Sequence, residues 1–376
     1  MQAWTQFTNL TLRGQKLDKK QLLELANDRR SHYKTPEWEQ SFWNFVFAWL
    51  NDKKDAINIK TSGSTGRPKS VRVSKQFMVN SALITGKYFN LKQNDTALLC
   101  LSSDYIAGKM MVVRAFVLGL DLHVAPQSSN PFSDLPENQN FKFGAMVPMQ
   151  LHQIIKEGEI ENLNRFETLL VGGAPIGSQL ISSIQNLKTK VFLTYGMTET
   201  VSHIAVKSLN GNTKSDWFET LDGIEIETDK KSCLLINAPM LNPQKVKTND
   251  IALINENNPK LFQFVGRHDN VINSGGIKLF PEILERKLSS LISKSDYFFA
   301  ALPDERLGQK LVLFIESQPL DSSKLFMLKF DMLFRLVKYE IPKEILFIKE
   351  FKRTPTRKIK RKATVKAYLQ SLEESN

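Results

Sequence analysis

Apolar and polar residues alternate along the first two thirds of the chain in a way that predicts strands and helices in turn. Apolar positions recur at helical spacing over residues 75–89 and 108–119, and Ser74 is placed to cap the first of these helices. Short apolar runs bounded by glycine, proline or polar residues are typical of buried strands. Such runs occupy residues 96–101, 143–147, 168–171 and 190–194. The alternation predicts an α/β fold in which layered sheets are covered by helices.

Residues 14–50 carry leucine, tryptophan and phenylalanine at helical spacing, so we expect this whole stretch to be helical. Residues 56–60 and 70–73 then predict two short strands on either side of a polar loop. From about Leu221 the pattern changes to short strands alone, which predicts a smaller antiparallel β subregion. These strands are expected at residues 224–228, 233–237, 251–255 and 261–265.

A second change of pattern follows Gly266. Helices are expected at residues 280–292 and 324–337, and strands at 297–302 and 310–315. This is a compact α+β unit of about 110 residues, within the usual size range of a domain. We therefore expect a large N-terminal α/β domain over residues 1–268 and a small, mobile C-terminal α+β domain over 269–376, joined at residues 266–270.

The composition of the chain is that of an ordinary globular protein, with 41% hydrophobic and 24% charged residues. The two cysteines, Cys100 and Cys233, are far apart and predict neither a disulfide framework nor a zinc site. The first residues lack the pattern of a signal peptide. The most apolar stretch, Met110–Leu120, contains Arg114 and is too short to span a bilayer. These features predict a cytoplasmic protein without membrane insertion.

The net charge of +12 raises the question of a nucleic-acid partner. Residues 350–366 hold eight Lys or Arg and one acidic residue, a net charge of +7. Such a segment can bind phosphate backbones, or it can be a solvated surface that complements small anionic ligands.

A loop rich in hydroxyls and glycine is the first candidate for chemistry. It consists of Thr61, Ser62, Gly63, Ser64, Thr65, Gly66, Arg67, Pro68 and Lys69. Glycines let backbone N–H groups approach an anion, and the hydroxyls and Lys69 add donors and charge, which suits a triphosphate. The loop differs from the Walker pattern, because strand-like sequence follows it where a helix would be required. A flexible hairpin turn is the alternative.

Two further groups of residues carry polar side chains at the ends of expected strands. Tyr195, Gly196, Thr198 and Glu199 follow the strand at 190–194, where α/β proteins usually bind ligands, and Glu199 is a candidate Mg²⁺ ligand. An ordinary turn with a helix-capping threonine is the alternative. Asp250 and Arg267 begin and end later strands, and an aspartate there can accept hydrogen bonds from both ribose hydroxyls. A β-turn aspartate and a surface arginine are the alternatives.

Together these motifs, in this order, closely resemble those of the acyl-adenylate-forming enzymes, which include acyl-CoA ligases, adenylation domains of peptide synthetases and luciferases. The resemblance covers most of the chain, from Thr61 to Lys362. It implies ATP, Mg²⁺ and coenzyme A as the small molecules that the protein uses with a carboxylic acid, and no nucleic acid. No coenzyme A motif is legible, so a carrier protein is an alternative acceptor.

The resemblance also implies a role for each matching residue. Thr61–Lys69 would hold the phosphates, Tyr195 would lie near the adenine, and Thr198 would contact the α-phosphate. Glu199 would hold Mg²⁺. Asp250 would bind the ribose with support from Arg267, Asp269 would be the hinge, and Lys358 would be the catalytic lysine of the first half-reaction. The adenine would be lined by Gly172, Gly173, Ala174 and Pro175.

Three residues depart from the family pattern: Ser70 follows the phosphate loop, Asn249 precedes Asp250 and Arg357 precedes Lys358, each where glycine is usual. All three change backbone freedom and leave the reactive side chains in place. The chain is also shorter than most members, with the usual N-terminal portion missing or condensed.

Within the family, residues 104–114 and the run Tyr195–Ala205 resemble the o-succinylbenzoate–CoA ligases of menaquinone biosynthesis. That substrate has a second carboxylate, so its pocket should offer a cation or several donors. The candidates are Tyr105, Lys109, Ser202 and His203. The alternatives are a structural role for His203, a solvated charge at a helix start for Lys109, and a different aryl or acyl substrate.

Overall fold

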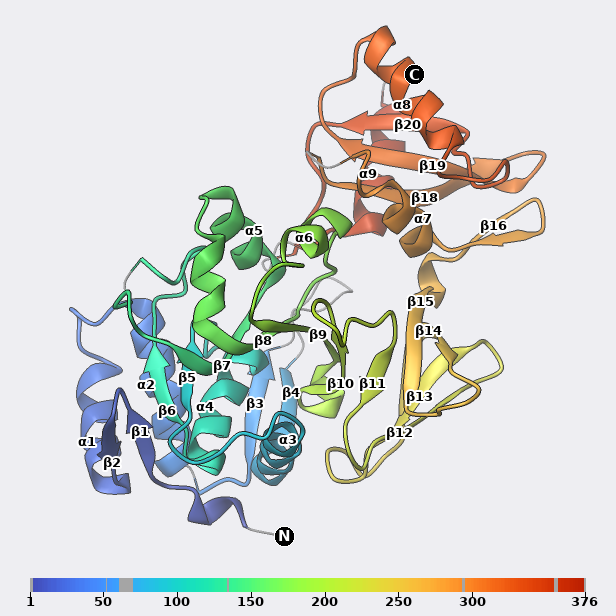
Figure 1. The fold of residues 1–376 in the computed structure, drawn as a ribbon. Helices are drawn as coiled ribbons and strands as arrows, with labels where there is room; N and C mark the ends of the chain where they lie inside the picture. The colour runs from blue at the N-terminus through green and yellow to red at the C-terminus, as the bar shows by residue number, and fades with distance from the viewer. Residues whose placement is uncertain are drawn as a thin grey trace.

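The computed structural model describes residues 3–51, 53–60, 70–133, 135–292, 295–354 and 358–374. Within this part of the chain the strands form one large sheet covered by helices, a two-stranded sheet of β3 (Ala56–Lys60) and β4 (Ser70–Ser74), and a smaller sheet formed by the C-terminal residues (Figure 1). The mixed α/β class expected from the sequence is confirmed. None of the described helices combines the length and the apolar character that crossing a membrane requires.

A 13-stranded sheet forms the large part of the molecule. In spatial order its strands are β12 (Glu225–Thr228), β13 (Cys233–Asn237), β14 (Val246–Ile254), β15 (Leu261–Arg267), β11 (Phe218–Thr220), β10 (His203–Ser208), β9 (Lys190–Gly196), β8 (Phe166–Val171), β7 (Phe141–Met146), β5 (Thr96–Leu99), β6 (Asp121–Val124), β1 (Leu10–Leu12) and β2 (Gln15–Leu17).

The strands from β9 to β1 are parallel, and helices cover both faces of that region. Side chains alternate between the faces: Ala97 and Leu99 join the core that holds α3 and α4, whereas Leu98 joins the core beneath α5 and α6. The helices are α2 (Glu37–Asn51), α3 (Lys75–Tyr88), α4 (Ile106–Leu118), α5 (Pro148–Lys156) and α6 (Ser178–Ser183), with 3₁₀ turns η1 (Trp4–Gln6) and η2 (Ile160–Arg165). Ser74 caps α3 as expected, since its side chain accepts a hydrogen bond from the N–H of Gln76.

The antiparallel strands β10 to β15 continue the same sheet, joined to its parallel part where β10 pairs with β9. The sequence predicted an antiparallel β subregion at these strands. The structure places them in one continuous layer, because β10 is the strand that turns back along β9 and offers the next free edge.

The expectation that residues 14–50 are wholly helical is wrong in two places. Residues Gln15–Leu17 form β2, which pairs with β1 across a tight turn at Arg13 and Gly14, both at positive φ. Helix α1 (Lys19–Arg29) starts only after this hairpin, where Asp18 and Gln21 form a capping box. The chain also leaves helical structure between α1 and α2. The two-residue turn overrides the helical spacing of the apolar positions.

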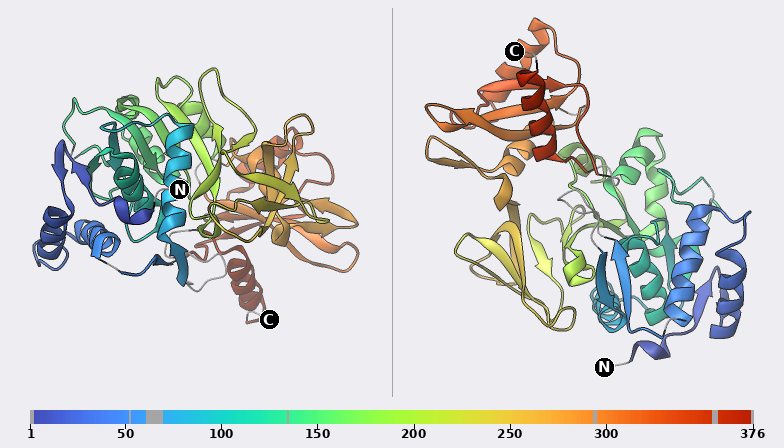
Figure 2. Two further views of the ribbon diagram at one scale, coloured as in Figure 1. Left: turned by 90° about the horizontal axis from the view of Figure 1, so that it is seen from below. Right: turned by 180° about the vertical axis from the view of Figure 1, so that it is seen from behind.

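A second sheet begins after the 3₁₀ turn η4 (His268–Asn270). It contains β16 (Ile272–Ser274), β17 (Ile277–Leu279), β18 (Tyr297–Asp304), β19 (Gly308–Glu316) and β20 (Glu344–Ile348), with helices α7 (Pro281–Leu288), α8 (Ser322–Leu333) and α9 (Arg361–Glu373). Its faces build two separate cores, one around Leu284 and Leu313 and one around Phe298 and Phe314. Figure 2 shows this part standing at one end of the molecule.

Candidate active site

The carboxyl ends of the parallel strands bring several predicted residues to one edge of the large sheet. Tyr105 follows β5, the segment Gly172–Pro175 follows β8, and Gly196 closes β9. Because parallel strands end at the same edge, these three loops lie along one edge of the sheet, with β7 between the strands β8 and β5, and ligand-binding loops of α/β folds lie at such an edge. The structure thus brings the predicted adenine-lining segment and the turn with Thr198 to one edge.

The glycines of these loops are required by close packing. A Cβ on Gly172 would lie 2.2 Å from Oγ1 of Thr194, and a Cβ on Gly196 would lie 2.3 Å from the carbonyl oxygen of Ser202. The backbone of both loops therefore runs closer to its neighbours than any other residue permits.

The turn after Gly196 presents Thr198 and Glu199 on a short 3₁₀ turn, η3 (Thr198–Thr200). The buried hydroxyl of Thr200 fixes this turn through hydrogen bonds to the carbonyls of Met197 and Ser202, at 3.0 and 2.9 Å. The side chain of Asn242 donates to the carbonyl of Glu199 at 3.0 Å. The Glu199 carboxylate itself is exposed to solvent. A fixed backbone with an exposed carboxylate suits a ligand that arrives from solution.

A second cluster joins Tyr195, Asp250 and Arg267. The Tyr195 hydroxyl donates to Oδ2 of Asp250 at 2.7 Å, and Nη1 of Arg267 lies 3.4 Å from Oδ1. Asp250 and Arg267 face each other in the register of β14 and β15. Burial and the Asp250 carboxylate raise the pKa of Tyr195, so the phenol stays protonated and remains a donor. The predicted ribose pair is therefore assembled, with Tyr195 as an additional partner.

Lys358 comes from the small C-terminal part and lies close to this cluster. Its side chain reaches solvent, but the surrounding protein partly desolvates it and lowers its pKa, and the Arg267 guanidinium lowers the pKa further. Thr354 holds the Lys358 backbone from both sides, with hydrogen bonds of 3.0 and 2.9 Å. Lys358 is thus close enough to Arg267 for their charges to interact, and Arg267 belongs to the cluster with Tyr195 and Asp250.

Two contacts hold the small part in this orientation. The side chain of Asn249 donates to Oδ2 of Asp269 at 3.2 Å, and the hydroxyls of Ser178 and Ser289 lie 2.5 Å apart. Asn249 is one of the departures from the family pattern. In this structure it binds the carboxylate of the predicted hinge residue.

The predicted phosphate loop, Thr61–Lys69, and Arg357 lie outside the described residues. The predicted strands that flank the loop form as β3 (Ala56–Lys60) and β4 (Ser70–Ser74), and the structure shows that they pair with each other, with Lys60 opposite Ser70. This hairpin places both ends of the loop next to each other.

Ser202 and His203 lie together with a buried arginine that residue-by-residue reading of the sequence did not select. Nη2 of Arg114 donates to Oγ of Ser202 at 3.0 Å and lies 3.5 Å from Nδ1 of His203. Thr85 lies 3.3 Å from Nε2 of His203 and donates its own proton to the Ser81 carbonyl, so His203 donates from Nε2. Burial, and then the charge of Arg114, lower the pKa of His203 well below its usual value, so the imidazole is neutral.

Arg114 is 2% exposed, and its Nε has no hydrogen-bond partner among the described residues. Burial lowers its pKa to about 10, which leaves it charged at neutral pH. A buried guanidinium is costly unless an anion or several acceptors meet it. In the sequence, Arg114 lies inside the apolar helix α4, which also contains Lys109, and within the run 104–114, but the pattern does not indicate that its guanidinium is buried.

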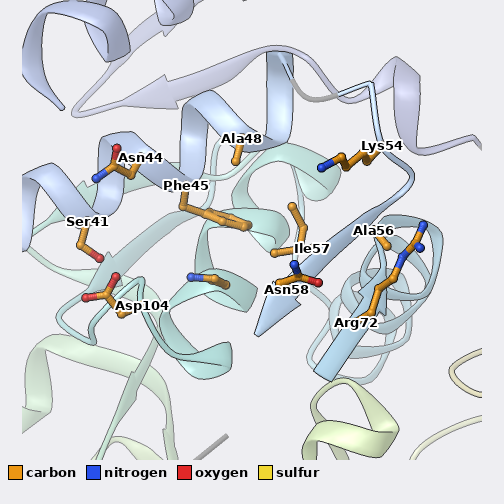
Figure 3. Close-up of a pocket in the computed structure, with 11 residues that line it drawn as sticks. Ser41, Asn44, Phe45, Ala48, Lys54, Ala56, Ile57, Asn58, Arg72 and Asp104 are labelled. Carbon is orange, nitrogen blue, oxygen red and sulfur yellow. The ribbon is translucent and has the colours of Figure 1, made fainter. Parts of the chain in front are cut away.

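Lys109 lies on a different face of α4 from Arg114. Its Nζ donates to the carbonyl of Ser103 and lies 5.2 Å from the ring centre of Phe45. It lines a cavity of about 430 Å³ between α2, the β3–β4 hairpin and the start of α4 (Figure 3). Tyr105, at the start of α4, is 41% exposed. The four predicted substrate residues therefore fall into three places: Ser202 lies with His203, Lys109 lines the cavity, and Tyr105 is exposed at the start of α4.

Within the described residues, no three acidic, histidine or cysteine side chains are grouped to form a metal site by themselves. Mg²⁺ commonly binds one or two carboxylates together with substrate phosphates. Glu199, exposed at the loop edge, fits that kind of site.

Comparison with known proteins identifies the family. The AMP-binding enzyme family model matches residues 10–222, more than half of the chain. The chain belongs to the AMP-binding enzyme family. A 2-succinylbenzoate–CoA ligase from Lactococcus lactis is 25% identical over 83% of this chain and 71% of its own length, and one from Listeria monocytogenes is 23% identical over 88% and 72%.

Solved structures of the AMP-binding family share the fold. An acyl-CoA synthetase (AMP-forming)/AMP-acid ligase II-like protein from Dyadobacter fermentans is 37% identical, with a TM-score of 0.60 over 92% of this chain and 97% of that chain. The o-succinylbenzoate coenzyme A synthetase from Bacillus subtilis, in complex with ATP and magnesium ion, is 16% identical with a TM-score of 0.73 over 95% and 96%.

Proposed function

We propose that this AMP-binding enzyme activates a carboxylic acid with ATP and transfers the acyl group to the thiol of coenzyme A. The observation that carries the proposal is the approach of Lys358 to Arg267, which belongs to the cluster with Tyr195 and Asp250. A cation from the small part thus lies within electrostatic range of the arginine that pairs with a carboxylate suited to ribose hydroxyls. That is the arrangement expected for a nucleotide whose α-phosphate reacts.

Each end of the nucleotide has a candidate partner in this proposal. Tyr195 and the segment Gly172–Pro175 contact the adenine, Asp250 binds the ribose with Arg267, and Thr198 contacts the α-phosphate. The loop Thr61–Lys69 holds the β- and γ-phosphates. Mg²⁺, held by Glu199, would supply positive charge at these phosphates.

The chemistry requires charge neutralisation more than a catalytic base. A carboxylate oxygen of the substrate attacks the α-phosphorus, and the bond to the leaving pyrophosphate breaks. Both reactants are anionic and repel each other. Lys69 and Lys358 neutralise this negative charge, so that the carboxylate and the α-phosphate can approach. The thiol sulfur then attacks the acyl carbon, AMP leaves, and the thiol proton passes to solvent.

Lys358 must withdraw before the thiol can reach the acyl carbon. We propose that residues 269–376 rotate as a domain against residues 1–268, with Asp269 as the hinge. The orientation in the structure, with Lys358 beside Arg267, is the one suited to the first half-reaction. The contacts of Asn249 with Asp269 and of Ser178 with Ser289 would have to open for the second.

We further propose o-succinylbenzoate as the acyl substrate, in menaquinone biosynthesis. The support comes from the 2-succinylbenzoate–CoA ligases to which the chain is similar and from the buried Arg114 beside Ser202 and His203. A guanidinium and a hydroxyl together bind the second carboxylate of this acid well. Another aryl or acyl acid is the alternative for the same machinery.

A nucleic-acid-binding role for the basic tail is less well supported. Arg353 is paired with Glu316 and Asp296 at 2.5 Å, and Arg361 with Glu285 at 2.7 Å. These two arginines stabilise the small part internally and are not available to a phosphate backbone.

The test is ATP–pyrophosphate exchange across a panel of carboxylic acids, followed by thioester formation with coenzyme A. We expect exchange with o-succinylbenzoate and a thioester only when coenzyme A is present. Thioester from fatty acids or simple benzoates, but none from o-succinylbenzoate, would overturn the substrate. Absence of exchange with every acid, together with steeply salt-dependent nucleic-acid binding, would overturn the reaction class.

A further inference from the structure

The outer face of α8 and the turn after it expose an unusual number of large apolar side chains. Thirteen such side chains are exposed in the described part of the chain, and seven of them fall between residues 326 and 339. They form what we call the α8 apolar face: Phe326, Met327, Phe330, Leu333, Phe334, Val337 and Tyr339. Figure 1 shows α8 at the end of the molecule that points away from the large sheet. Contiguous exposed apolar surface of this kind marks an interaction site.

The face is a regular feature of the helix. Phe326, Phe330 and Phe334 follow one another at four-residue intervals, with ring centres 6.4 and 5.1 Å apart. The opposite side of the same segment anchors it, because Met332 and Leu336 are buried in the core of the small part. One side of the segment therefore packs into the core, and the row of phenylalanines on the other side is available to a partner.

Basic residues border the α8 apolar face. Lys329, Arg335 and Lys338 are exposed, and none of them takes part in an ion pair found among the described residues. Lys324 is paired with Asp321 at 2.8 Å, and Asp331 is the one acidic residue between 322 and 339. The chain as a whole carries a net charge of +12. The partner of this face should therefore be both apolar and anionic.

We propose that the α8 apolar face binds the surface of an anionic lipid bilayer. A protruding helix with phenylalanine and leucine on one side, bordered by lysine and arginine, has the composition of helices that lie in a membrane interface. The rings enter the boundary between headgroups and acyl chains, and the basic residues meet anionic headgroups. The candidate active site, at the other end of the small part, stays open to solvent in this orientation.

A second copy of the chain fits this face less well. A two-fold interface would place the face against itself and bring Lys329, Arg335 and Lys338 of both copies together. Like charges would meet, with Asp331 alone to offset them. An anionic lipid surface would instead attract these basic residues.

The proposal is tested by flotation of the full-length protein with two kinds of vesicle: phosphatidylcholine alone, and phosphatidylcholine with about 30% phosphatidylglycerol. We expect the protein to float with the anionic vesicles, to remain in solution with the neutral ones, and to be released as salt is raised. Two variants separate the contributions: Phe326→Ser/Phe330→Ser/Phe334→Ser removes the rings, and Lys329→Glu/Arg335→Glu/Lys338→Glu reverses the charges.

Each variant should reduce vesicle binding at least about tenfold. Both change exposed side chains, so circular dichroism and ATP–pyrophosphate exchange should match those of the unaltered protein. Leu253→Ser and Lys230→Glu, which change an exposed apolar and an exposed basic residue elsewhere, are the matched controls and should float normally.

Three results would overturn the proposal. The first is failure of the protein to bind anionic vesicles, even if it binds another protein. The second is undiminished binding by the phenylalanine variant. The third is dimerisation in place of vesicle binding: light scattering would show a dimer that forms with rising protein concentration, and the phenylalanine variant would abolish it. The face would then be an interface between copies of the chain.

Discussion

The Tyr195 hydroxyl donates a 2.7 Å hydrogen bond to Oδ2 of Asp250, on a strand four positions away in the sheet. Arg267 approaches the other carboxylate oxygen at 3.4 Å. Each carboxylate oxygen has two acceptor directions, so one on each oxygen is left for a further donor. Two vicinal hydroxyls of a ribose can occupy them, and Tyr195 and Arg267 fix the carboxylate in the required orientation.

The first prediction concerns this hydrogen bond. Tyr195→Phe should raise the KM for ATP about tenfold with a smaller effect on kcat, because a hydrogen bond to a charged group contributes about 1.5–3 kcal/mol. ATP–pyrophosphate exchange at varied ATP measures it. Tyr88→Phe is the matched control, since Tyr88 donates to Glu219 at the same 2.7 Å but outside the site. Equal KM values in the two variants would exclude Asp250 as the ribose ligand.

The second prediction separates the two half-reactions. Lys358→Ala should reduce adenylation at least about 10²-fold, because a charge that stabilises the transition state is lost. Thioester formation from supplied acyl adenylate should be spared. Pyrophosphate release and single-turnover thioester formation measure the two steps.

Lys362→Ala is the control for this variant, because it removes an exposed positive charge from the same basic segment. It should leave both steps unchanged. Normal pyrophosphate release by Lys358→Ala would mean that Lys358 is not the lysine of the first half-reaction.

Much of the fold was predictable because local pattern and tertiary context agree in most elements. The run at 233–237 is β13 as predicted, and Ser74 caps α3. The prediction failed where context decides. The β2 strand depends on a two-residue turn. Helix α9 begins within the basic segment 350–366, where the many lysines and arginines obscure the helical spacing of the apolar residues. The continuity of one sheet from β9 into β10 depends on pairing between strands, which periodicity does not encode.

The candidate site was predictable only to the extent that it consists of motifs. Tyr195, Asp250, Arg267 and Lys358 belong to motifs that occur in the family's order, and the structure joins the first three in one cluster with Lys358 in electrostatic range of Arg267. Arg114 lies in the matching run 104–114, but the sequence did not predict a role for it. Its importance comes from burial beside Ser202 and His203, which lie about 90 residues further along the chain and meet it only in the folded structure.

The third prediction concerns the contact between Asn249 and the predicted hinge residue Asp269. Removing the 3.2 Å hydrogen bond in Asn249→Ala should weaken the observed orientation by up to about 1 kcal/mol. Adenylation should slow a few-fold, and thioester formation from supplied adenylate should become faster. Asn257→Ala, at an exposed turn, is the control. If both half-reactions slow equally, this contact does not select between the two orientations.

The fourth prediction tests substrate recognition by Arg114. Arg114→Met keeps the volume of the side chain and removes the charge, so kcat/KM for o-succinylbenzoate should fall about 10²-fold. An analogue that keeps the reacting carboxylate and lacks the second one should be used equally well by both proteins. The variant should fold at least as stably, because replacing a buried charge by an apolar side chain is often neutral or favourable.

Lys109→Met separates the two candidate cations of α4. Lys109 lies on another face of the helix and contacts the Ser103 carbonyl. If its variant, and not Arg114→Met, loses the preference for the dicarboxylate, the second carboxylate binds in the cavity of Figure 3.

The last prediction concerns the neutral His203 and the pH dependence of stability. Its folded-state pKa lies well below 6.5, because the side chain is buried and the charge of Arg114 is close. The unfolded chain therefore binds a proton below about pH 6.5 that the folded protein does not bind. Stability should fall as the pH drops through this range, by up to about 1.4 kcal/mol per pH unit from this one group.

His203→Asn cannot take up that proton, so urea unfolding between about pH 7.5 and 5 should show a shallower loss of stability. His32→Asn, at an exposed position, should keep the slope of the unaltered protein. A slope that His203→Asn leaves unchanged would mean that His203 is already protonated in the folded state, and the site beside Arg114 would then carry two positive charges instead of one.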